Sequence, residues 1–391
     1  MRIRHYDPKN AEEKKAHAKL EKAIDAWWKA FAKKVDAIGA LFVNEGERWD
    51  LPEFMHHTLG AVDKRLMWEF GRPLGKSPLF RLVITPEHER ELMPLSQLLF
   101  SRAPKMPKVE LYDGRVPERI AMVDGTVKAR LGDGMPETQV VVTPGEHLMI
   151  DLSFLMKGCK GPDDEDARAK AIVAAEVLLG EKMMVDHIGA ITVGKPKKST
   201  KAIELRALRT TVQALAKKID GALPSASCMA RKAKAQWTLF KLEQAKTKAK
   251  DFPGQQDLFV AVTMIPDVWQ ATHATTPFRS RRFSSKHEVF VYIKIDGAKG
   301  LEGTAYEDRE DIENDLAKAL EPKLGCVVGG GTGTRYSYVE LALLNVPQAI
   351  PAIQKTLIKG KITERAWILF HDSDLAAEWI GIYPKTPAPP T

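Results

Sequence analysis

Apolar residues recur at every third or fourth position in the N-terminal part of the chain and then alternate with polar residues in short runs. Over residues 10–42 the apolar side chains keep helical spacing, and the adjacent Trp27 and Trp28 widen the apolar face. This pattern predicts one long amphipathic helix that packs against a domain core. The spacing predicts a second helix over residues 51–64.

Two segments between residues 65 and 195 show the same succession of patterns. Each begins with two apolar runs of strand length, continues with a helical segment and ends with a third strand. The predicted strands are 66–72, 79–86 and 108–114 in the first segment and 138–144, 146–155 and 190–194 in the second, and the predicted helices are 86–100 and 163–182. We therefore expect two strand-strand-helix-strand units that form a structural repeat.

Residues 202–250 have helical propensity and form the most basic part of the chain. Between Lys217 and Lys250, nine lysine or arginine residues stand against two acidic residues. The sizeable apolar side chains of this section are Trp237, Leu239, Phe240 and Leu242. We predict a basic helical connector over residues 201–255, and the Pro253–Gly254 pair marks a domain boundary.

The C-terminal section has alternating apolar runs separated by two helical patterns. The predicted strands are 257–265, 287–295, 326–331, 335–344, 366–371 and 378–383, with helices over 306–324 and after Asn345. This succession contains the strand-helix-strand-strand-helix-strand order of a ferredoxin-like unit.

The predicted fold class is α+β, with repeated strand-strand-helix-strand units, a ferredoxin-like C-terminal domain and long flanking helices. An N-terminal helical element and the repeated units occupy residues 1–200, and the basic connector occupies 201–255. The ferredoxin-like domain covers 256–384, and residues 385–391 form a flexible tail.

The stretch CVVGGGTGTRYSYVELALL, residues 326–344, contains the glycines that most resemble a phosphate-binding loop. Such a loop needs a helix after its glycines, and in the Walker form it also needs a lysine. Here an alternating strand follows Arg335, so the pattern favours a hairpin with a bulge. The alternative is a loop in which Thr332, Thr334 and Arg335 contact a ligand.

Composition limits the class of protein. The 391 residues carry a net charge of +8, which permits an anionic partner but is modest for this length. The N-terminus lacks the apolar core of a signal peptide, and no apolar run approaches a membrane span. Three widely spaced cysteines fit free thiols in a reducing compartment. We expect a cytoplasmic protein with no membrane contact and no cofactor.

Catalytic and metal-binding motifs are weak in this chain. The HDSD stretch at 371–374, with Glu378 nearby, offers an imidazole and carboxylates, but it lacks the ligand series of a calcium loop. We predict no metal site. Catalytic residues stay unassigned, and an enzyme without a familiar motif is the third hypothesis for this chain.

Nucleic-acid binding is the second hypothesis. Its basic residues would neutralise phosphates while an aromatic ring stacks on a base. The residues assigned to this role are Lys232, Lys234, Trp237, Lys241, Arg279, Arg281 and Arg282, with Phe283, Lys246, Lys248 and Lys250 in support.

Several stretches resemble known proteins. LMWEFG, FRLVITPEHERELMPLSQLLFSRAPKMP and LLGEKMMVDHIGAITV resemble a widespread family of uncharacterised bacterial proteins that carry a domain of unknown function. The stretch from DREDIENDLAKAL through GGGTGTRYSYVEL to EWIGIYP is similar to domains found with that family and, more remotely, to the ferredoxin-like regulator of ribonuclease E activity. The resemblance leaves residues 202–250 uncovered. It implies a fold type and a bacterial cytoplasm, and it assigns no catalytic residue.

The function best supported by the sequence is intracellular binding or regulation through a protein partner. A ferredoxin-like sheet exposes one face, on which aromatic side chains anchor partners. The candidate anchors are Tyr336, Tyr338, Trp367 and Trp379, although core packing explains these aromatic residues equally well.

Overall fold

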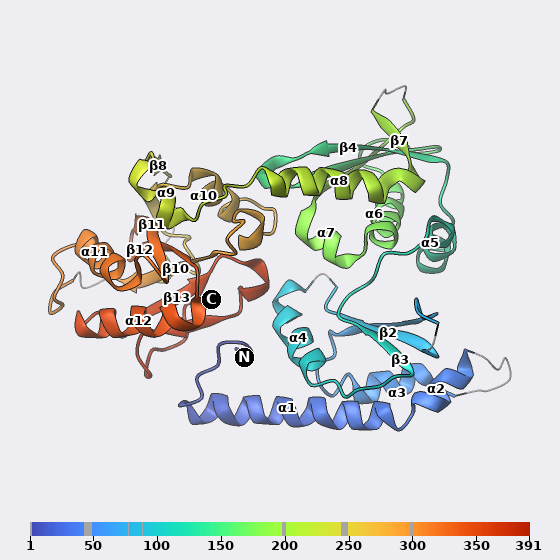
Figure 1. Cartoon of the computed structure of the whole chain (residues 1–391), viewed down its shortest axis with the longest axis horizontal. Helices are drawn as coiled ribbons and strands as arrows, with labels where there is room; N and C mark the ends of the chain where they lie inside the picture. The colour runs from blue at the N-terminus through green and yellow to red at the C-terminus, as the bar shows by residue number, and fades with distance from the viewer. Residues whose placement is uncertain are drawn as a thin grey trace. The chain divides into compact units, whose positions relative to one another are not determined.

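The computed structural model of the chain describes residues 2–42, 49–76, 78–87, 89–197, 201–243, 249–297 and 301–391. These residues form two compact units (Figure 1). The N-terminal unit comprises Lys15–Gly221, and the C-terminal unit comprises Met1–Lys14 together with Ala222–Thr391. Both units combine helices with β-sheets, so the predicted α+β fold class is confirmed.

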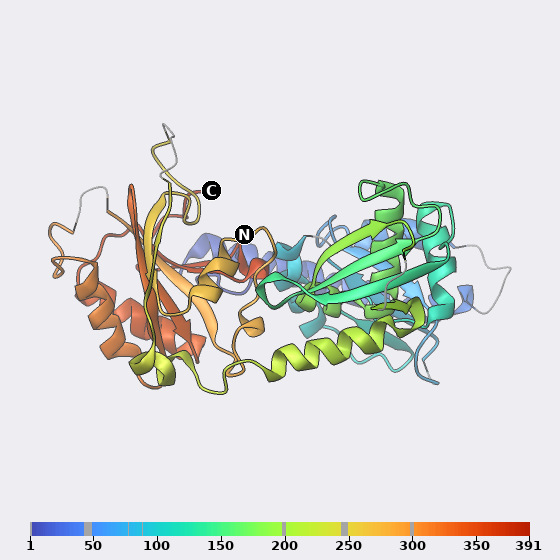
Figure 2. The same cartoon turned by 90° about the horizontal axis from the view of Figure 1, so that it is seen from above.

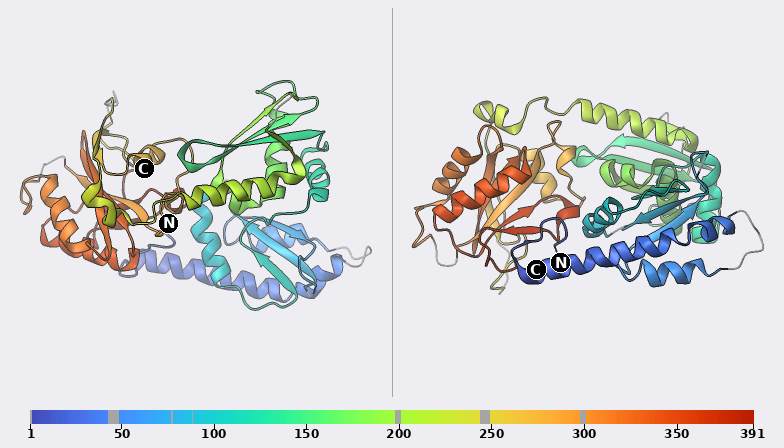
Figure 3. Two further views of the ribbon diagram at one scale, coloured as in Figure 1. Left: turned by 45° about the horizontal axis from the view of Figure 1, so that its top comes forward. Right: turned by 60° about the horizontal axis from the view of Figure 1, so that its bottom comes forward.

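The first half of the N-terminal unit is a three-stranded sheet packed against helices (Figure 3). Trp27 and Trp28 are buried, and Trp28 Nε1 donates a hydrogen bond to the Leu99 carbonyl oxygen at 2.9 Å. The first predicted helix therefore packs on a core, but it is interrupted after Ala32. The elements are α1 (Ala11–Ala32), α2 (Val35–Leu41), α3 (Leu51–Thr58), β1 (Met67–Gly71), β2 (Phe80–Thr85), η1 (Arg90–Leu92), α4 (Met93–Ser101) and β3 (Val109–Tyr112).

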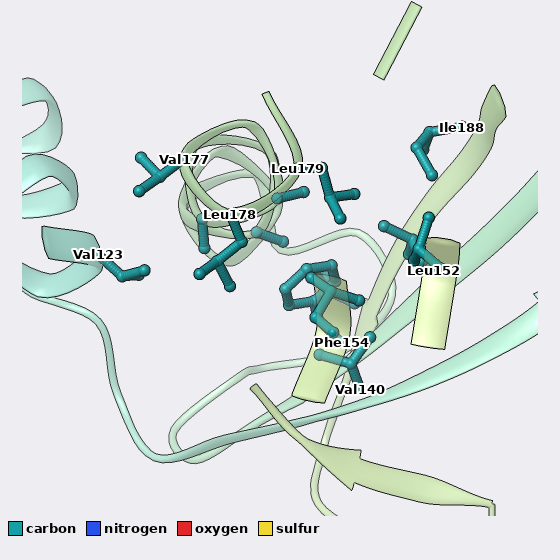
Figure 4. Close-up of a cluster of buried hydrophobic side chains, with 14 of the residues drawn as sticks. Val123, Val140, Leu152, Phe154, Val177, Leu178, Leu179 and Ile188 are labelled. Atoms are coloured by element: carbon teal, nitrogen blue, oxygen red, sulfur yellow. The ribbon is translucent and has the colours of Figure 1, made fainter. Parts of the chain in front are cut away.

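The second half of this unit is a four-stranded sheet with order β6-β5-β4-β7. Leu152 and Phe154 of β5 pack against Leu178 and Leu179 of α6 in its core (Figure 4). The elements are η2 (Ile120–Met122), α5 (Val123–Leu131), β4 (Thr138–Pro144), η3 (Glu146–Leu148), β5 (Ile150–Met156), α6 (Glu165–Leu179), α7 (Glu181–His187), β6 (Ile188–Gly194), β7 (Ala202–Glu204), η4 (Leu205–Ala207) and α8 (Leu208–Gly221).

Both predicted strand-strand-helix-strand units are present, and their strands pair in the same way. In the first, β1 is antiparallel to β2 and β2 is parallel to β3; in the second, β4 is antiparallel to β5 and β5 is parallel to β6. A helical crossover, α4 or α6, joins the parallel strands in each case, as parallel pairing requires.

The C-terminal unit is built on one antiparallel sheet of seven strands, with order β14-β13-β10-β12-β11-β9-β8. Helices α11 and α12 cover one face of this sheet (Figure 2). The elements are α9 (Cys228–Arg231), η5 (Lys232–Lys234), β8 (Thr238–Lys241), β9 (Leu258–Thr263), α10 (Pro266–Thr272), η6 (Ser280–Arg282), β10 (Val289–Asp296), α11 (Arg309–Leu320), β11 (Gly325–Gly333), β12 (Tyr336–Leu343), α12 (Val346–Lys359), β13 (Ala366–Phe370), η7 (Ser373–Leu375) and β14 (Trp379–Gly381).

From β10 to β13 the chain follows the strand-helix-strand-strand-helix-strand order that the sequence predicts. Three further strands extend this core, β14 beside β13 and the β9–β8 pair beside β11. Assignment to the ferredoxin-like class itself stays a prediction.

The predicted connector, 201–255, does not stand apart as a helical segment. Its first part contributes β7, which pairs with β4, and α8, whose Leu208 and Val212 enter the core of the N-terminal unit. Its later part contributes β8, which pairs with β9. Within the predicted tail, Thr386 is buried and the Pro387 carbonyl oxygen accepts a hydrogen bond from Trp367 Nε1 at 2.6 Å, whereas Lys385, Ala388 and Thr391 are exposed.

Candidate protein-binding surface

The glycine stretch forms the predicted hairpin. Strands β11 and β12 pair antiparallel, and their register shifts between Val327 and Gly329, which is the predicted bulge. Added Cβ atoms at Gly330 and Gly331 would lie 2.3 Å from Glu313 Oε1 and 2.4 Å from Leu258 Cδ1. The glycines therefore allow neighbouring groups to approach the strand closely.

The three residues assigned to a ligand-contact loop contact the protein itself. Thr332 Oγ1 accepts a hydrogen bond from Arg309 Nη1 at 2.9 Å, and the backbone N–H of Thr334 donates to the Asp257 carbonyl oxygen at 3.1 Å. Arg335 forms an ion pair with Asp296, with Nη2 and Oδ2 2.7 Å apart. These contacts hold the end of the β11–β12 hairpin against neighbouring segments of the same unit.

Three of the four predicted aromatic anchors are core residues. Tyr336, Tyr338 and Trp367 are fully buried, and only Trp379 is partly exposed. Their predicted position on an open face is wrong because other segments cover this side of the sheet, including Phe252 and Trp269.

A buried lysine that sequence reasoning missed lies in the same region. Lys294 donates a hydrogen bond from Nζ to the Phe252 carbonyl oxygen, and Nζ lies 4.0 Å from the centre of the Tyr336 ring. Burial lowers the pKa of Lys294 to about 8, and the charges of Asp257 and Asp251 oppose that shift. A lysine with a lowered pKa often marks a functional site. Here the amine already donates a hydrogen bond to a backbone carbonyl oxygen, so its contacts are structural.

The side chains of His371 and Glu340 form a buried pair, with Nε2 and Oε2 2.7 Å apart. Gln255 Nε2 donates a hydrogen bond to Glu340 Oε1 at 2.6 Å. The cavity beside the pair has a volume of about 10 Å³, which is room for about one water molecule and for no substrate. The pair could exchange a proton, but the cavity beside it is too small to hold a substrate.

The acidic residues after His371 have structural partners. The backbone N–H of Ser280 donates to Asp372 Oδ1 at 2.8 Å, and Asp374 pairs with Arg279 at 2.9 Å. Within the described ranges, no group of three or more His, Cys, Asp or Glu side chains is arranged to hold a metal ion.

The basic residues proposed for nucleic-acid binding are not all available. Arg279, Arg282 and Phe283 are buried, so their predicted contacts with phosphates and bases are wrong. Lys232 forms an ion pair with Glu321. Arg281 and Lys250 are exposed. Lys246 and Lys248 lie outside the described residues.

Five exposed residues of the basic section lie on or close in sequence to the edge strand β8. Trp237, Leu239 and Leu242 are 49%, 54% and 39% exposed, and Lys234 and Lys241 are exposed between and beside them. We call these five residues the β8 surface. By strand alternation Leu239 and Lys241 share one face of the sheet, and Leu242 lies on the opposite face with Phe240. Isolated exposed apolar residues are ordinary, but several on and beside one edge strand indicate an interaction site.

The sequence contains a signal for this strand that its lysine content obscured. Residues 237–242, WTLFKL, are rich in aromatic and β-branched types, and over 237–241 exposed positions alternate with less exposed ones. Phe240 points inward and stacks on Trp269, with ring centres 4.0 Å apart.

A groove of about 730 Å³ also lies in the C-terminal unit, between residues 2–13, α12 and the last residues of the chain. Ile350 and Ile358 of α12 line it together with Trp379. Arg2, which also lines the groove, pairs with Glu13 at 2.5 Å and stacks over Trp379 at 3.7 Å. The charged side chain of Arg2 in this groove is therefore already engaged by Glu13 and Trp379.

Comparison with protein-family models, with curated proteins and with solved structures gives no match to this chain. The resemblance to the bacterial family therefore stays a prediction. No helix among the described residues is both long enough and apolar enough to cross a membrane.

Proposed function

We propose that this chain is a binding protein that engages a protein partner through the β8 surface. The observation that carries the proposal is an edge strand that exposes Leu239 and Lys241 and is flanked by exposed Trp237 and Leu242. Large apolar side chains exposed on an edge strand promote association, whereas edge lysines discourage indiscriminate strand pairing. Aromatic and aliphatic anchors with a charged rim are typical of protein interfaces.

Two other readings have weaker support. The nucleic-acid hypothesis is weakened because Arg279 and Arg282 are buried and cannot contact phosphates. It can still be tested, because Trp237 is exposed between the exposed Lys234 and Lys241. Catalysis lacks a reactant site beside the His371–Glu340 pair, the clearest acid–base arrangement described above.

The test is site-specific photo-crosslinking in the cell that produces the protein. A benzophenone amino acid replaces Leu239 in one variant and Met122, which is 49% exposed in the N-terminal unit, in a control. We expect one protein adduct from position 239 that survives nuclease and that weakens when Trp237→Ser is added. A nuclease-sensitive adduct would favour the nucleic-acid reading, and equal labelling from both positions would contradict a specific surface.

A further inference from the structure

The backbone of β8 has a defined set of groups that point away from the sheet. The Leu242 N–H donates to the Phe259 carbonyl oxygen at 2.9 Å, so these two residues form a hydrogen-bonded pair in the antiparallel register. Hydrogen-bonded and non-hydrogen-bonded pairs alternate along such a register. Leu239 and Lys241 therefore direct their N–H and C=O groups to the open edge, where β8 has no described neighbour.

The side chains of these same two residues lie on one face of the sheet. Leu239 is opposite Val262 and Lys241 is opposite Val260, and both valines are only partly buried. The apolar side chain of Leu239 and the ammonium of Lys241 are thus two positions apart on one face. The four outward backbone groups beside them have no strand partner among the described residues.

We propose that the β8 edge accepts an extended acidic segment of the partner as an additional antiparallel strand. This inference rests on the proposed function and names the partner's chemistry. The incoming residues opposite Lys241 and Leu239 would bond through their backbones, the first carrying a carboxylate and the second an apolar side chain. The recognised pattern, read from N to C, is acid, any residue, apolar.

Charge complementarity selects this occupant. Between Arg231 and Glu243 the exposed charged side chains are Lys234 and Lys241 against Glu243, and the sequence continues with further lysines. Two copies joined at this edge would bring two basic segments together, and their lysines would repel one another. The carboxylates of an acidic segment would instead be attracted to these lysines. The test must therefore also detect dimer formation, in which a second copy of the chain occupies the β8 edge.

Substitutions at the edge separate backbone pairing from side-chain contact. Leu239→Pro removes an N–H that β9 does not use, and proline is tolerated at such an edge position. Leu239→Val keeps both the N–H and an apolar side chain. Lys241→Glu reverses the charge, and Lys355→Glu, at an exposed position of α12, is its matched control.

The probe is a phage-displayed library of random linear nine-residue peptides, selected on the full-length protein. We expect enrichment of acid-x-apolar segments, with Kd weakened about tenfold or more by Lys241→Glu and by Leu239→Pro. Leu239→Val and Lys355→Glu should leave Kd nearly unchanged. Added salt should weaken binding, since the acid–lysine contact is exposed.

Three outcomes would overturn the inference: no enrichment above the Lys241→Glu background, enriched peptides that bind Leu239→Pro equally well, or a dimer in sedimentation that the edge variants dissolve. If crosslinking at position 239 still captures a protein partner, the proposed function stands and only strand addition fails. If crosslinking also fails, the β8 surface itself is not the interface.

Discussion

Strand alternation places Lys294 between Ile293 and Ile295, a pattern that from sequence alone suggests a lysine on a solvent-facing side of a strand. The fold buries it instead, because the segment containing Phe252 covers that face and supplies a carbonyl oxygen for the amine. The same cover buries Tyr336 and Tyr338. A single strand's pattern cannot report which distant segment lies over it, so these positions are the ones that sequence reasoning misplaces.

The buried amine predicts a pH dependence of stability. The pKa of Lys294 falls from 10.5 to about 8 on folding, mainly through burial. Between those values the unfolded chain binds more protons, so the free energy of unfolding rises with pH through this window. Comparing wild type with Lys294→Met by urea unfolding, we expect the stability of wild type relative to the variant to increase by about 1.5 kcal/mol from pH 8 to 9.5. A difference that is flat with pH would refute the lowered pKa.

Gly330 gives a second test at the scale of one residue. A Cβ atom there would lie 2.3 Å from Glu313 Oε1 and 2.9 Å from the Tyr338 carbonyl oxygen, so Gly330→Ala forces the Glu313 side chain to move and the β12 backbone to shift. We expect thermal and urea unfolding to show a loss of about 1–3 kcal/mol. In the control, Gly125→Ala in α5, nothing lies within 4 Å of the new methyl group, and a gain of about 0.5–1 kcal/mol is expected.

Elements with strong periodicity are the part of the structure that sequence predicts well. Both strand-strand-helix-strand units and the hairpin of β11 and β12 are found where alternation and turn residues indicate them. The failures share a cause: β8 is a short edge strand in a lysine-rich section, and β7 has three residues. Such strands form because a neighbouring strand offers hydrogen bonds, and local propensity contributes little. The candidate surface was hidden for the same reason.

Arg115 links several elements of the N-terminal unit, and its removal should test that link. Its guanidinium pairs with Glu69 of β1 at 3.1 Å, with Glu176 of α6 at 2.9 Å and with Glu87, which follows β2. Because the side chain is mostly buried, Arg115→Met would leave Glu87 without its cation, while Arg130 still pairs with Glu69 and Glu176. We expect a cost of about 3 kcal/mol in urea unfolding.

Two further variants distinguish charge from packing at this cluster. Arg115→Lys keeps the charge but cannot reach all three carboxylates, so its loss should be intermediate. Adding Glu87→Gln to Arg115→Met should recover part of the stability, because one uncompensated charge is removed. Equal losses for the lysine and methionine variants would show that packing, and not charge, sets the contribution of Arg115.

At the scale of the whole molecule, the two units do not follow the order of the chain. The first residues, up to Lys14, belong with Ala222–Thr391 although they precede the N-terminal unit in sequence. A contiguous division into domains, such as 1–200 and 256–384, cannot express this arrangement. No hydrophobic pattern in residues 1–10 indicates it, because the attachment is made by individual contacts. The Glu378 carboxylate accepts hydrogen bonds from backbone N–H groups, Arg2 stacks over Trp379, and His5 stacks on Phe370.

That attachment supplies the last prediction. The Glu378 carboxylate, which is buried, accepts hydrogen bonds from the N–H groups of Ile3, Arg4 and His5 at 2.7, 3.0 and 2.8 Å. Three bonds to one charged acceptor fix the segment in place, so Glu378→Gln should destabilise the C-terminal unit by about 2–3 kcal/mol.

Hydrogen exchange locates the effect within the molecule. Amides of residues 3–5 and of β13 and β14 should lose protection in Glu378→Gln, while those of β5 and β6 in the N-terminal unit keep theirs. Exposed Glu364 provides the control, because Glu364→Gln removes an equal charge from the same unit without touching the N-terminal segment. Loss of protection spread evenly over both units would mean that the N-terminal residues stabilise the whole chain, and the division into two units would then not describe its cooperativity.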